Sequence, residues 1–301
     1  MDIPTTLKYF RKKLQLRQKD VLQEMDSSVY SRIESGHREL KVSELTTYLN
    51  TLSLLPEEFF SLSPLNAEQQ AFNSLFFHCS KDIRNSKLKK AMLQYYKNLQ
   101  NKHIKTLREQ SNYLVIRNYF AQFWKEIDKL TTAEAADVCE QLLKKSYYQY
   151  YDYTIVMNLI RFFDKKKTDK LVHKMLLQQQ NPPKQIRQRC THILLNLITM
   201  RIYEKDFDGA KNYIYLAKKQ DPTKGNLHFQ INLKYLENLL TYQLTGNYDC
   251  MQRIQEYIHL LKDIGDYSLA EQIEAEIKLV VHNILDHTNQ SSFPVTVITE
   301  T

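Results

Sequence analysis

A short stretch near the amino terminus brings hydroxyl and guanidinium side chains together at helical spacing. Ser27, Ser28, Ser31 and Arg32 lie close enough in the chain to share the exposed face of one helix. Serine hydroxyls donate and accept hydrogen bonds, and an arginine can reach a phosphate or a guanine edge. Such residues suit contact with DNA in the major groove. The alternative is an ordinary amphipathic helix with a solvated polar face.

The segment before these serines is strongly basic. Between residues 8 and 19 it has six basic side chains and no acid: Lys8, Arg11, Lys12, Lys13, Arg17 and Lys19. Clustered cations of this kind hold a protein on DNA phosphates. A second run, 81–108, has nine basic residues and a single acid at Asp82. It supports two interpretations, a further phosphate surface or a solvated face whose lysine stems cover apolar groups.

A different chemistry is suggested by four asparagines in similar apolar settings. Asn118, Asn158, Asn196 and Asn238 follow one another at intervals of 40, 38 and 42 residues. An asparagine amide can pair with both the C=O and the N–H of an extended peptide, so a ladder of them could hold a peptide backbone. Equally, these amides could satisfy hydrogen bonds between buried helices.

Other side chains lie near these asparagines on the expected helices. Arg161, His192 and Lys234 could receive an acidic side chain or a peptide carboxyl terminus, and Tyr242 would share their surface. The candidate peptide-binding residues are Asn158, Arg161, His192, Asn196, Lys234, Asn238, Tyr242 and Asn118.

The elements that position these residues are expected to be helices. The 301 residues include only 5 Gly and 7 Pro, which argues against sandwiches and glycine-lined phosphate sites. Near the amino terminus, apolar spacing predicts helices over 4–14, 18–24, 27–35 and 43–52, and a fifth from Pro56. Asp26 is expected to cap the third helix, and Gly36 to end it in a left-handed conformation. Leu7, Phe10 and Leu14 are expected on the inner face of the first.

Beyond residue 68 the chain repeats a helical pair. Helices are expected over 69–79, then in pairs from about residue 110, with a last pair at 249–264 and 267–285. Because pairs of this size cannot bury their apolar faces alone, they should stack into an array. We therefore expect a DNA-binding domain at 1–62, a linker at 63–68, a peptide-binding and dimerisation domain at 69–286 and a mobile tail at 287–301.

The amino-terminal segment resembles the Xre/Cro type of helix-turn-helix domain. The resemblance rests on Gln18 and on the string Ser28-Val29-Tyr30-Ser31-Arg32-Ile33-Glu34-Ser35-Gly36, followed by LTTYLNTLSLLPEEFF. The interval from Gln18 to Gly36 is about two residues shorter than is common in that family. The candidate DNA-binding residues are Gln18, Lys19, Ser27, Ser28, Ser31, Arg32, Arg38, Arg11 and Arg17. Because one such domain contacts a single half-site, a homodimer is expected.

The repeated part is similar to tetratricopeptide units, above all LLNLITMRIYEKDFDGAKNYIYLAKKQDP. The combination resembles the peptide-responsive regulators of Gram-positive bacteria, the Rgg/MutR branch in particular, which is related to the PlcR/PrgX group. This resemblance implies an all-α homodimeric transcription factor that binds promoter DNA and a short hydrophobic signalling peptide. The alternatives are a constitutive repressor whose repeats serve only dimerisation, and a scaffold that binds a protein partner in the groove.

Several classes of protein are disfavoured by the remaining features. There is no H-E-x-x-H, G-x-S-x-G or glycine-rich phosphate loop, so we expect neither an enzyme nor a cofactor. Cys79, Cys139, Cys190 and Cys250 lack metal-site spacing and suggest reduced thiols, with an inter-subunit disulfide as the alternative. No apolar window is long enough for a membrane span, the start of the chain lacks a secretory signal, and the expected location is cytoplasmic. The net charge of +8 is compatible with a nucleic-acid partner.

Overall fold

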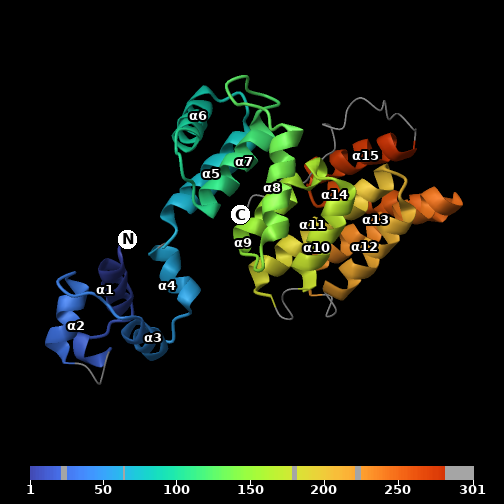
Figure 1. The fold of residues 1–301 in the computed structure, drawn as a ribbon. Helices are drawn as coiled ribbons and strands as arrows, with labels where there is room; N and C mark the ends of the chain where they lie inside the picture. The colour runs from blue at the N-terminus through green and yellow to red at the C-terminus, as the bar shows by residue number, and fades with distance from the viewer. Residues whose placement is uncertain (22–25, 64, 178–181, 221–224, 282–301) are drawn as a thin grey trace. The chain divides into compact units, whose positions relative to one another are not determined.

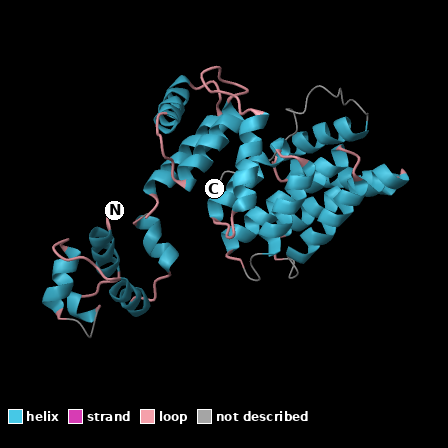
Figure 2. Ribbon diagram, viewed as in Figure 1, coloured by secondary structure: helices cyan, strands magenta, loops and turns pink. Residues whose placement is uncertain are grey.

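The described residues of the computed structural model are entirely helical (Figures 1 and 2). They comprise 1–21, 26–63, 65–177, 182–220 and 225–281. Within these ranges there are fifteen α-helices, two short 3-10 turns and no strand, which confirms the expected all-α class. The expected tail at 287–301, Pro64 of the expected linker and Pro222 at the end of the third repeat lie outside the described residues.

The chain divides into two compact units, Met1–Lys81 and Asp82–Thr301. This division falls after the fifth α-helix, whereas the sequence pattern placed the boundary at 63–68. The elements of the first unit are α1 (Ile3–Lys13), the 3-10 turn η1 (Gln18–Asp20), α2 (Ser27–Glu34), α3 (Val42–Thr51), α4 (Pro56–Leu62) and α5 (Ala67–Lys81). Only the first turn of the predicted 18–24 helix is described, and it is a 3-10 turn.

The core of the first unit includes Leu7, which the apolar spacing placed on the inner face of the first helix. Its fully or nearly buried members are Leu7, Val21, Tyr30, Ile33, Tyr48, Leu49, Leu52 and Phe59. The Tyr48 hydroxyl donates a hydrogen bond of 2.7 Å to the Leu7 main-chain oxygen and so ties α3 to α1. The expectation for Leu14 was wrong, because α1 ends at Lys13 and Leu14 is 46% exposed at its carboxyl end.

The second unit is a series of helix pairs. Its helices are α6 (Ser86–Gln100), α7 (Leu107–Phe120), α8 (Thr132–Lys144), α9 (Tyr150–Leu159), α10 (Lys165–Leu177), α11 (Lys184–Tyr203), α12 (Phe207–Gln220), α13 (Leu227–Thr245), α14 (Tyr248–Asp263) and α15 (Tyr267–Val281), with the 3-10 turn η2 (Ile160–Phe162) after α9. Successive odd-numbered helices pack on one another, α7 on α9, α9 on α11 and α11 on α13. The even-numbered α8 and α10 pack together, and α14 contacts both α13 and α15 (Figure 1). This is the tetratricopeptide-like array that the sequence predicts.

Close packing within a pair explains the glycine of the third repeat. A Cβ atom at Gly209 would lie 2.2 Å from Asp206 Oδ2 and 3.1 Å from Arg201 Cδ. The Asp206 carboxylate accepts a hydrogen bond from the Gly209 main-chain N–H and pairs with Lys165. A side chain at position 209 would therefore displace a carboxylate that several groups use.

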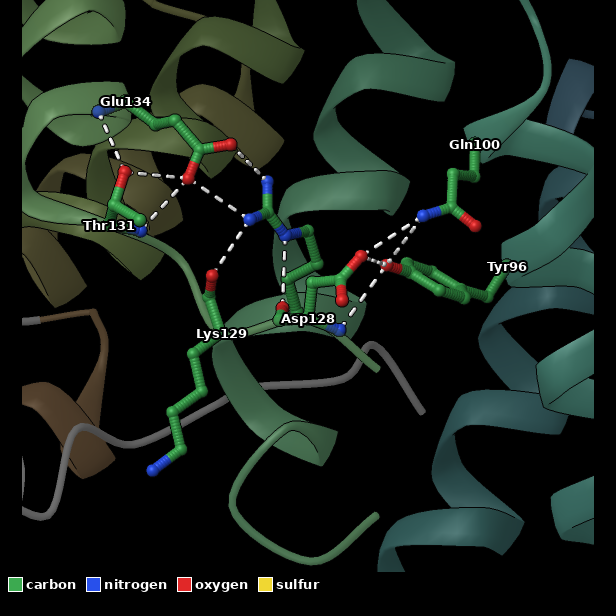
Figure 3. A network of polar contacts seen from close by, with 7 residues as sticks. Tyr96, Gln100, Asp128, Lys129, Thr131 and Glu134 are labelled. Atoms are coloured by element: carbon green, nitrogen blue, oxygen red, sulfur yellow. Dashed lines mark hydrogen bonds and ion pairs between the residues drawn. The ribbon is translucent and has the colours of Figure 1, made fainter. Parts of the chain in front are cut away.

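A buried arginine braces the first pair of the array. Arg117 on α7 donates to both carboxylate oxygens of Glu134, at 2.8 and 3.0 Å, and to the main-chain oxygens of Asp128 and Lys129. Figure 3 shows Glu134 and Thr131 on one side of this network and Tyr96 and Gln100 on the other, both reaching Asp128. The guanidinium holds the pKa of Glu134 at about 2. The loop between α7 and α8 is thereby fixed from both sides.

Candidate functional site

Helix α2 presents a polar face to solvent and an apolar face to the core. The Asp26 carboxylate accepts a 2.8 Å hydrogen bond from the Ser28 N–H, and Gly36 has a φ of +76°, so both predicted caps are confirmed. Tyr30 and Ile33 are fully buried, which turns the opposite side outward. Ser27, Ser28 and Arg32 are exposed and Ser31 is half-buried. The side chains predicted to contact DNA therefore share one solvent-facing surface.

A buried ion pair holds this helix in place. The Arg11 Nε and Nη2 atoms donate to the two oxygens of Glu34 at 2.6 and 2.8 Å, and Arg11 Nη1 donates to the Leu16 main-chain oxygen. Gln18 Nε2 donates to the same Glu34 carboxylate at 3.1 Å. The Arg11 side chain is only 12% exposed and that of Glu34 only 3%. The Arg11 guanidinium therefore positions α1, η1 and α2, and it is too buried for the DNA contact that the sequence suggested.

The other cations of the first unit are nearer to solvent. Arg17 is 72% exposed at the side chain and pairs with Asp20, and Lys19 is exposed beside it. Arg38 bonds Glu44 at 2.8 Å and is partly exposed. An ion pair as exposed as that of Arg17 is weak and easily exchanged for a phosphate. These residues remain available for the backbone contacts that fix register on a duplex.

Two of the four asparagines meet between neighbouring helices of the array. Asn118 Nδ2 donates to the main-chain oxygen of Asn158 at 3.0 Å, and Asn118 Oδ1 accepts from Arg161 Nη2 at 2.7 Å. Asn158 Nδ2 donates to Thr154 O in its own helix, and its buried Oδ1 has no hydrogen-bond partner. Asn118 thus has the helix–helix role that was the alternative interpretation.

The third asparagine contacts α9 from the other side. Asn196 Nδ2 lies 3.4 Å from the Met157 main-chain oxygen. At this point α9 gives way to η2, and such a change of helix type leaves carbonyls available to outside donors. Asn118 of α7 and Asn196 of α11 therefore both donate hydrogen bonds to main-chain oxygens near the irregular end of α9. Asn196 differs from Asn118 in being only partly buried, because its side chain also lines a cavity.

That cavity lies between α11, α13 and α15 and has a volume of about 70 Å³. We call it the Glu276 pocket. Its lining residues are His192, Leu195, Asn196, Thr199, His228, Asn232, Tyr235, Leu236, Leu269, Gln272, Ile273 and Glu276. Of the predicted peptide-binding residues, it brings together His192 and Asn196.

Three residues that line the Glu276 pocket have buried polar atoms without a hydrogen-bond partner. Glu276 Oε1, the Tyr235 hydroxyl and His192 Nδ1 are buried and have no hydrogen-bond partner. Burial raises the pKa of Glu276 to about 7. Burial lowers the pKa of His192 to about 4, so this imidazole is neutral at pH 7. His192 can act here as a neutral donor or acceptor, but not as the cation that the sequence interpretation required.

A second depression, of about 440 Å³, continues along the same face of α11. It is lined by Lys184, Arg187, Gln188, Thr191, Gly225, Asn226 and Leu227, and we call it the Arg187 hollow. Gln188 of this hollow and His192, Leu195 and Thr199 of the Glu276 pocket follow at intervals of four, three and four residues, and Thr191 of the hollow is next to His192. The two depressions therefore share one helix face.

Six predicted peptide-binding residues line neither depression. Lys234 is 63% exposed at the side chain and pairs with Glu237, Asn238 is buried, and Tyr242 packs against the core. The other three are Asn118, Asn158 and Arg161. Arg161 lies over the Phe162 ring, and desolvation lowers its pKa.

Three pocket residues that the sequence interpretation missed are His228, Asn232 and Tyr235, spaced along one face of α13. Glu276 was also missed, although it falls at an apolar position between Ile273 and Ile277. A charged residue at such a position was the available signal.

The described residues offer little for metal or redox chemistry. Among them no three His, Cys, Asp or Glu side chains are grouped to hold a metal ion. The four cysteines are all free and buried. No helix in the described ranges is long and apolar enough to cross a membrane.

Comparison with known proteins places the array in a family. Residues 78–275, more than half of the chain, match the model for the C-terminal domain of the HTH-type transcriptional regulator Rgg. The chain belongs to the Rgg family. Rgg proteins are transcriptional regulators, which agrees with the expectation that the chain is not an enzyme. No curated protein matches it.

The fold of this Rgg protein is shared with solved structures of low sequence identity. A PrgX/cCF10 complex is 19% identical with a TM-score of 0.74, over 93% of this chain and 92% of that one. The SHP pheromone receptor Rgg2 of Streptococcus dysgalactiae is 16% identical with a TM-score of 0.73, over 94% and 100%. A putative transcriptional regulator from Listeria monocytogenes is 17% identical with a TM-score of 0.74, over 94% and 99%. These similarities extend over more than nine tenths of the chain.

Proposed function

We propose that this Rgg protein is a sequence-specific DNA-binding regulator whose helical array binds a short hydrophobic signalling peptide and couples it to promoter activity. The proposal of DNA binding rests on the outward face of α2. There Ser27, Ser28 and Arg32 are exposed, and the buried Arg11–Glu34 pair holds the helix from the inside. Helix α2 is held in place by this ion pair and presents short polar side chains and the exposed guanidinium of Arg32. A helix of this kind fits the major groove. Lys19, Arg17 and Arg38 would contact the flanking phosphates.

The peptide half rests on the two depressions that share a face of α11. From Gln188 to Thr199 the helix rises about 16 Å, a span that an extended peptide covers with about five residues. The leucines and isoleucine of the Glu276 pocket suit the aliphatic part of a peptide side chain, and the exposed Lys184 and Arg187 suit a terminal carboxylate. A bacterial peptide pheromone–receptor complex of the same fold, and the pheromone receptor Rgg2, support a peptide as the ligand class.

Coupling requires two arrangements of a homodimer that differ in peptide affinity. A peptide that binds one arrangement more tightly changes its population and hence the spacing of the two α2 helices on DNA. By the same linkage, operator DNA must change peptide affinity by an equal factor.

One alternative keeps support from the structure. Asn118 and Asn196 bond to neighbouring helices, so part of the asparagine series is explained without a ligand. In a constitutive repressor the array would serve only dimerisation or a protein partner.

The deciding experiment is a mobility shift on DNA from upstream of the gene, with and without short hydrophobic peptides from culture supernatant. We expect a shift that is competed by specific DNA and a change in operator affinity when peptide is added. Binding of a peptide by calorimetry with unchanged operator affinity and unchanged transcription would reject the coupling and favour the constitutive repressor.

A further inference from the structure

The Glu276 pocket contains an acid for which the described residues supply no counter-ion. Glu276 is only 5% exposed and Tyr235 only 4%, and neither Glu276 Oε1 nor the Tyr235 hydroxyl has a hydrogen-bond partner. Leaving such groups unpaired in a folded interior costs free energy that a ligand can recover. Both residues line the same cavity.

No cation among the described residues reaches this acid. The lining residues include two histidines, His192 and His228, but no lysine or arginine. His192 is neutral at pH 7, since burial lowers its pKa to about 4. On the helix that carries Glu276, the nearby Glu274 already pairs with Lys262 of α14, and Lys278 is exposed. None of the described residues therefore supplies a positive charge opposite Glu276.

We propose that the Glu276 pocket receives an ammonium or guanidinium group of the bound ligand, with the Glu276 carboxylate as its counter-ion. The inference builds on the proposed function, because it states which group of the signalling peptide enters this pocket. A volume of about 70 Å³ admits the head of one side chain or a terminal amine. The amide oxygens of Asn196, Asn232 and Gln272 can accept the remaining N–H groups. Leu195, Leu236 and Leu269 can cover an aliphatic stem.

Entry of the cation changes the protonation of the pocket. With a pKa of about 7, Glu276 holds a proton in much of the free protein at neutral pH. A cation binds the ionised carboxylate, so binding releases a proton, and affinity rises with pH until the carboxylate is ionised in the free protein. The titratable groups nearest to Glu276 are Tyr203, Tyr235 and the two histidines. Burial keeps His192 neutral and both tyrosines protonated between pH 6.5 and 8.

The test uses the full-length protein and small probes in place of the unidentified peptide. Binding of n-butylammonium and of agmatine is measured by ligand-observed NMR at pH 6 and pH 8, beside n-butanol and butyrate. We expect both cations to bind more tightly at pH 8, by up to about tenfold, and the alcohol and the anion not to bind. Glu276→Gln should weaken the cations by about tenfold or more, and Glu271→Gln, on an exposed site of the same helix, should leave them unchanged.

Three results would overturn the proposal: equal binding of n-butanol, full retention of binding in Glu276→Gln, or an affinity that is the same at pH 6 and pH 8. The last uses the unaltered protein, so it decides the matter even if the variant fails to fold. With an active peptide in hand, acetylation of its amino terminus and replacement of its Lys or Arg by norleucine separate the two sources of the cation.

The outcome is independent of the proposed function. If the cations bind as expected but no peptide alters operator affinity, the pocket assignment stands and the regulatory coupling fails. If peptides alter operator affinity while the cations do not bind, the coupling stands and the pocket assignment fails.

Discussion

The side-chain nitrogen of Asn118 lies 3.0 Å from the main-chain oxygen of Asn158, so the first two members of the asparagine series bond directly across neighbouring helices. The side-chain oxygen of Asn118 meanwhile accepts from Arg161. Both ends of the amide are used, which makes Asn118 a structural connection between α7 and the carboxyl end of α9. A residue that spacing alone groups with ligand contacts can thus belong to the framework that supports them.

Removal of this amide should destabilise the array. We expect Asn118→Ala to lower the free energy of unfolding of the second unit by about 2 kcal/mol, since it leaves a carbonyl and a guanidinium N–H unpaired in a buried place. Asn98→Ala, at an exposed position of α6, is the matched control and should be neutral or slightly stabilising. Urea unfolding followed by circular dichroism measures both, and equal midpoints for the two variants would contradict the assignment.

Arg11 should matter for folding rather than for DNA contact. Arg11→Met leaves the Glu34 carboxylate buried without its cation, and we expect a loss of about 3 kcal/mol in the stability of the first unit. Arg17→Met removes a 72% exposed charge of the same type and should cost little. Thermal unfolding distinguishes the two. A stable Arg11→Met protein that has lost only DNA affinity would return Arg11 to the interface.

Arg32 should have the opposite profile. Its side chain is exposed on α2, so Arg32→Ala should leave stability unchanged and weaken operator binding by about 1–3 kcal/mol. Arg253→Ala removes an exposed cation from α14 in the second unit and should leave operator affinity unchanged. Titrations at two salt concentrations show whether Arg32 contacts a base or a phosphate, because only a lost phosphate contact reduces the salt dependence. Unaltered affinity in Arg32→Ala would exclude α2 as the recognition helix.

The stability of the protein should fall as the pH rises through the titration of Glu276. Its pKa is raised from 4.5 to about 7, so the folded state holds the proton more tightly than the unfolded chain. The resulting stabilisation is complete below pH 4.5 and is lost as the pH approaches 7. Glu276→Gln should therefore be more stable than the natural protein at pH 8, by about 2–3 kcal/mol, and similar to it near pH 4.5. Chemical unfolding at a series of pH values tests this, and a pH-independent difference would contradict it.

The local features that were predicted correctly depend on short stretches of sequence. Asp26 caps α2 and Gly36 ends it, because these residue types satisfy helix ends through their own geometry. Leu7 is fully buried and Phe10 packs against the same core, because helical periodicity places both on one side of α1.

The candidate sites depend on contacts between residues that are far apart in the sequence, and no local sequence pattern contains such contacts. Arg11 pairs with Glu34 across 23 positions, and nothing near Arg11 in the chain distinguishes it from the exposed Lys12. His192 lies on the expected helix face, but its charge state is set by burial among α13 and α15. The sequence pattern did not point to Glu276, because this residue lies 38 positions after Asn238, the last asparagine of the repeated series.

The four buried cysteines can report local opening of the protein through the reactivity of their thiols. Cys79, Cys139, Cys190 and Cys250 lie in α5, α8, α11 and α14, and each is less than a tenth exposed. Burial also raises the pKa of the Cys79 and Cys139 thiols to about 11 and that of Cys190 to about 12, so they react only when their surroundings open. The rate at which each thiol is alkylated therefore measures the opening of one sector of the chain without any engineered label. A ligand bound along α11 would slow the reaction at Cys190 more than at the distant Cys139.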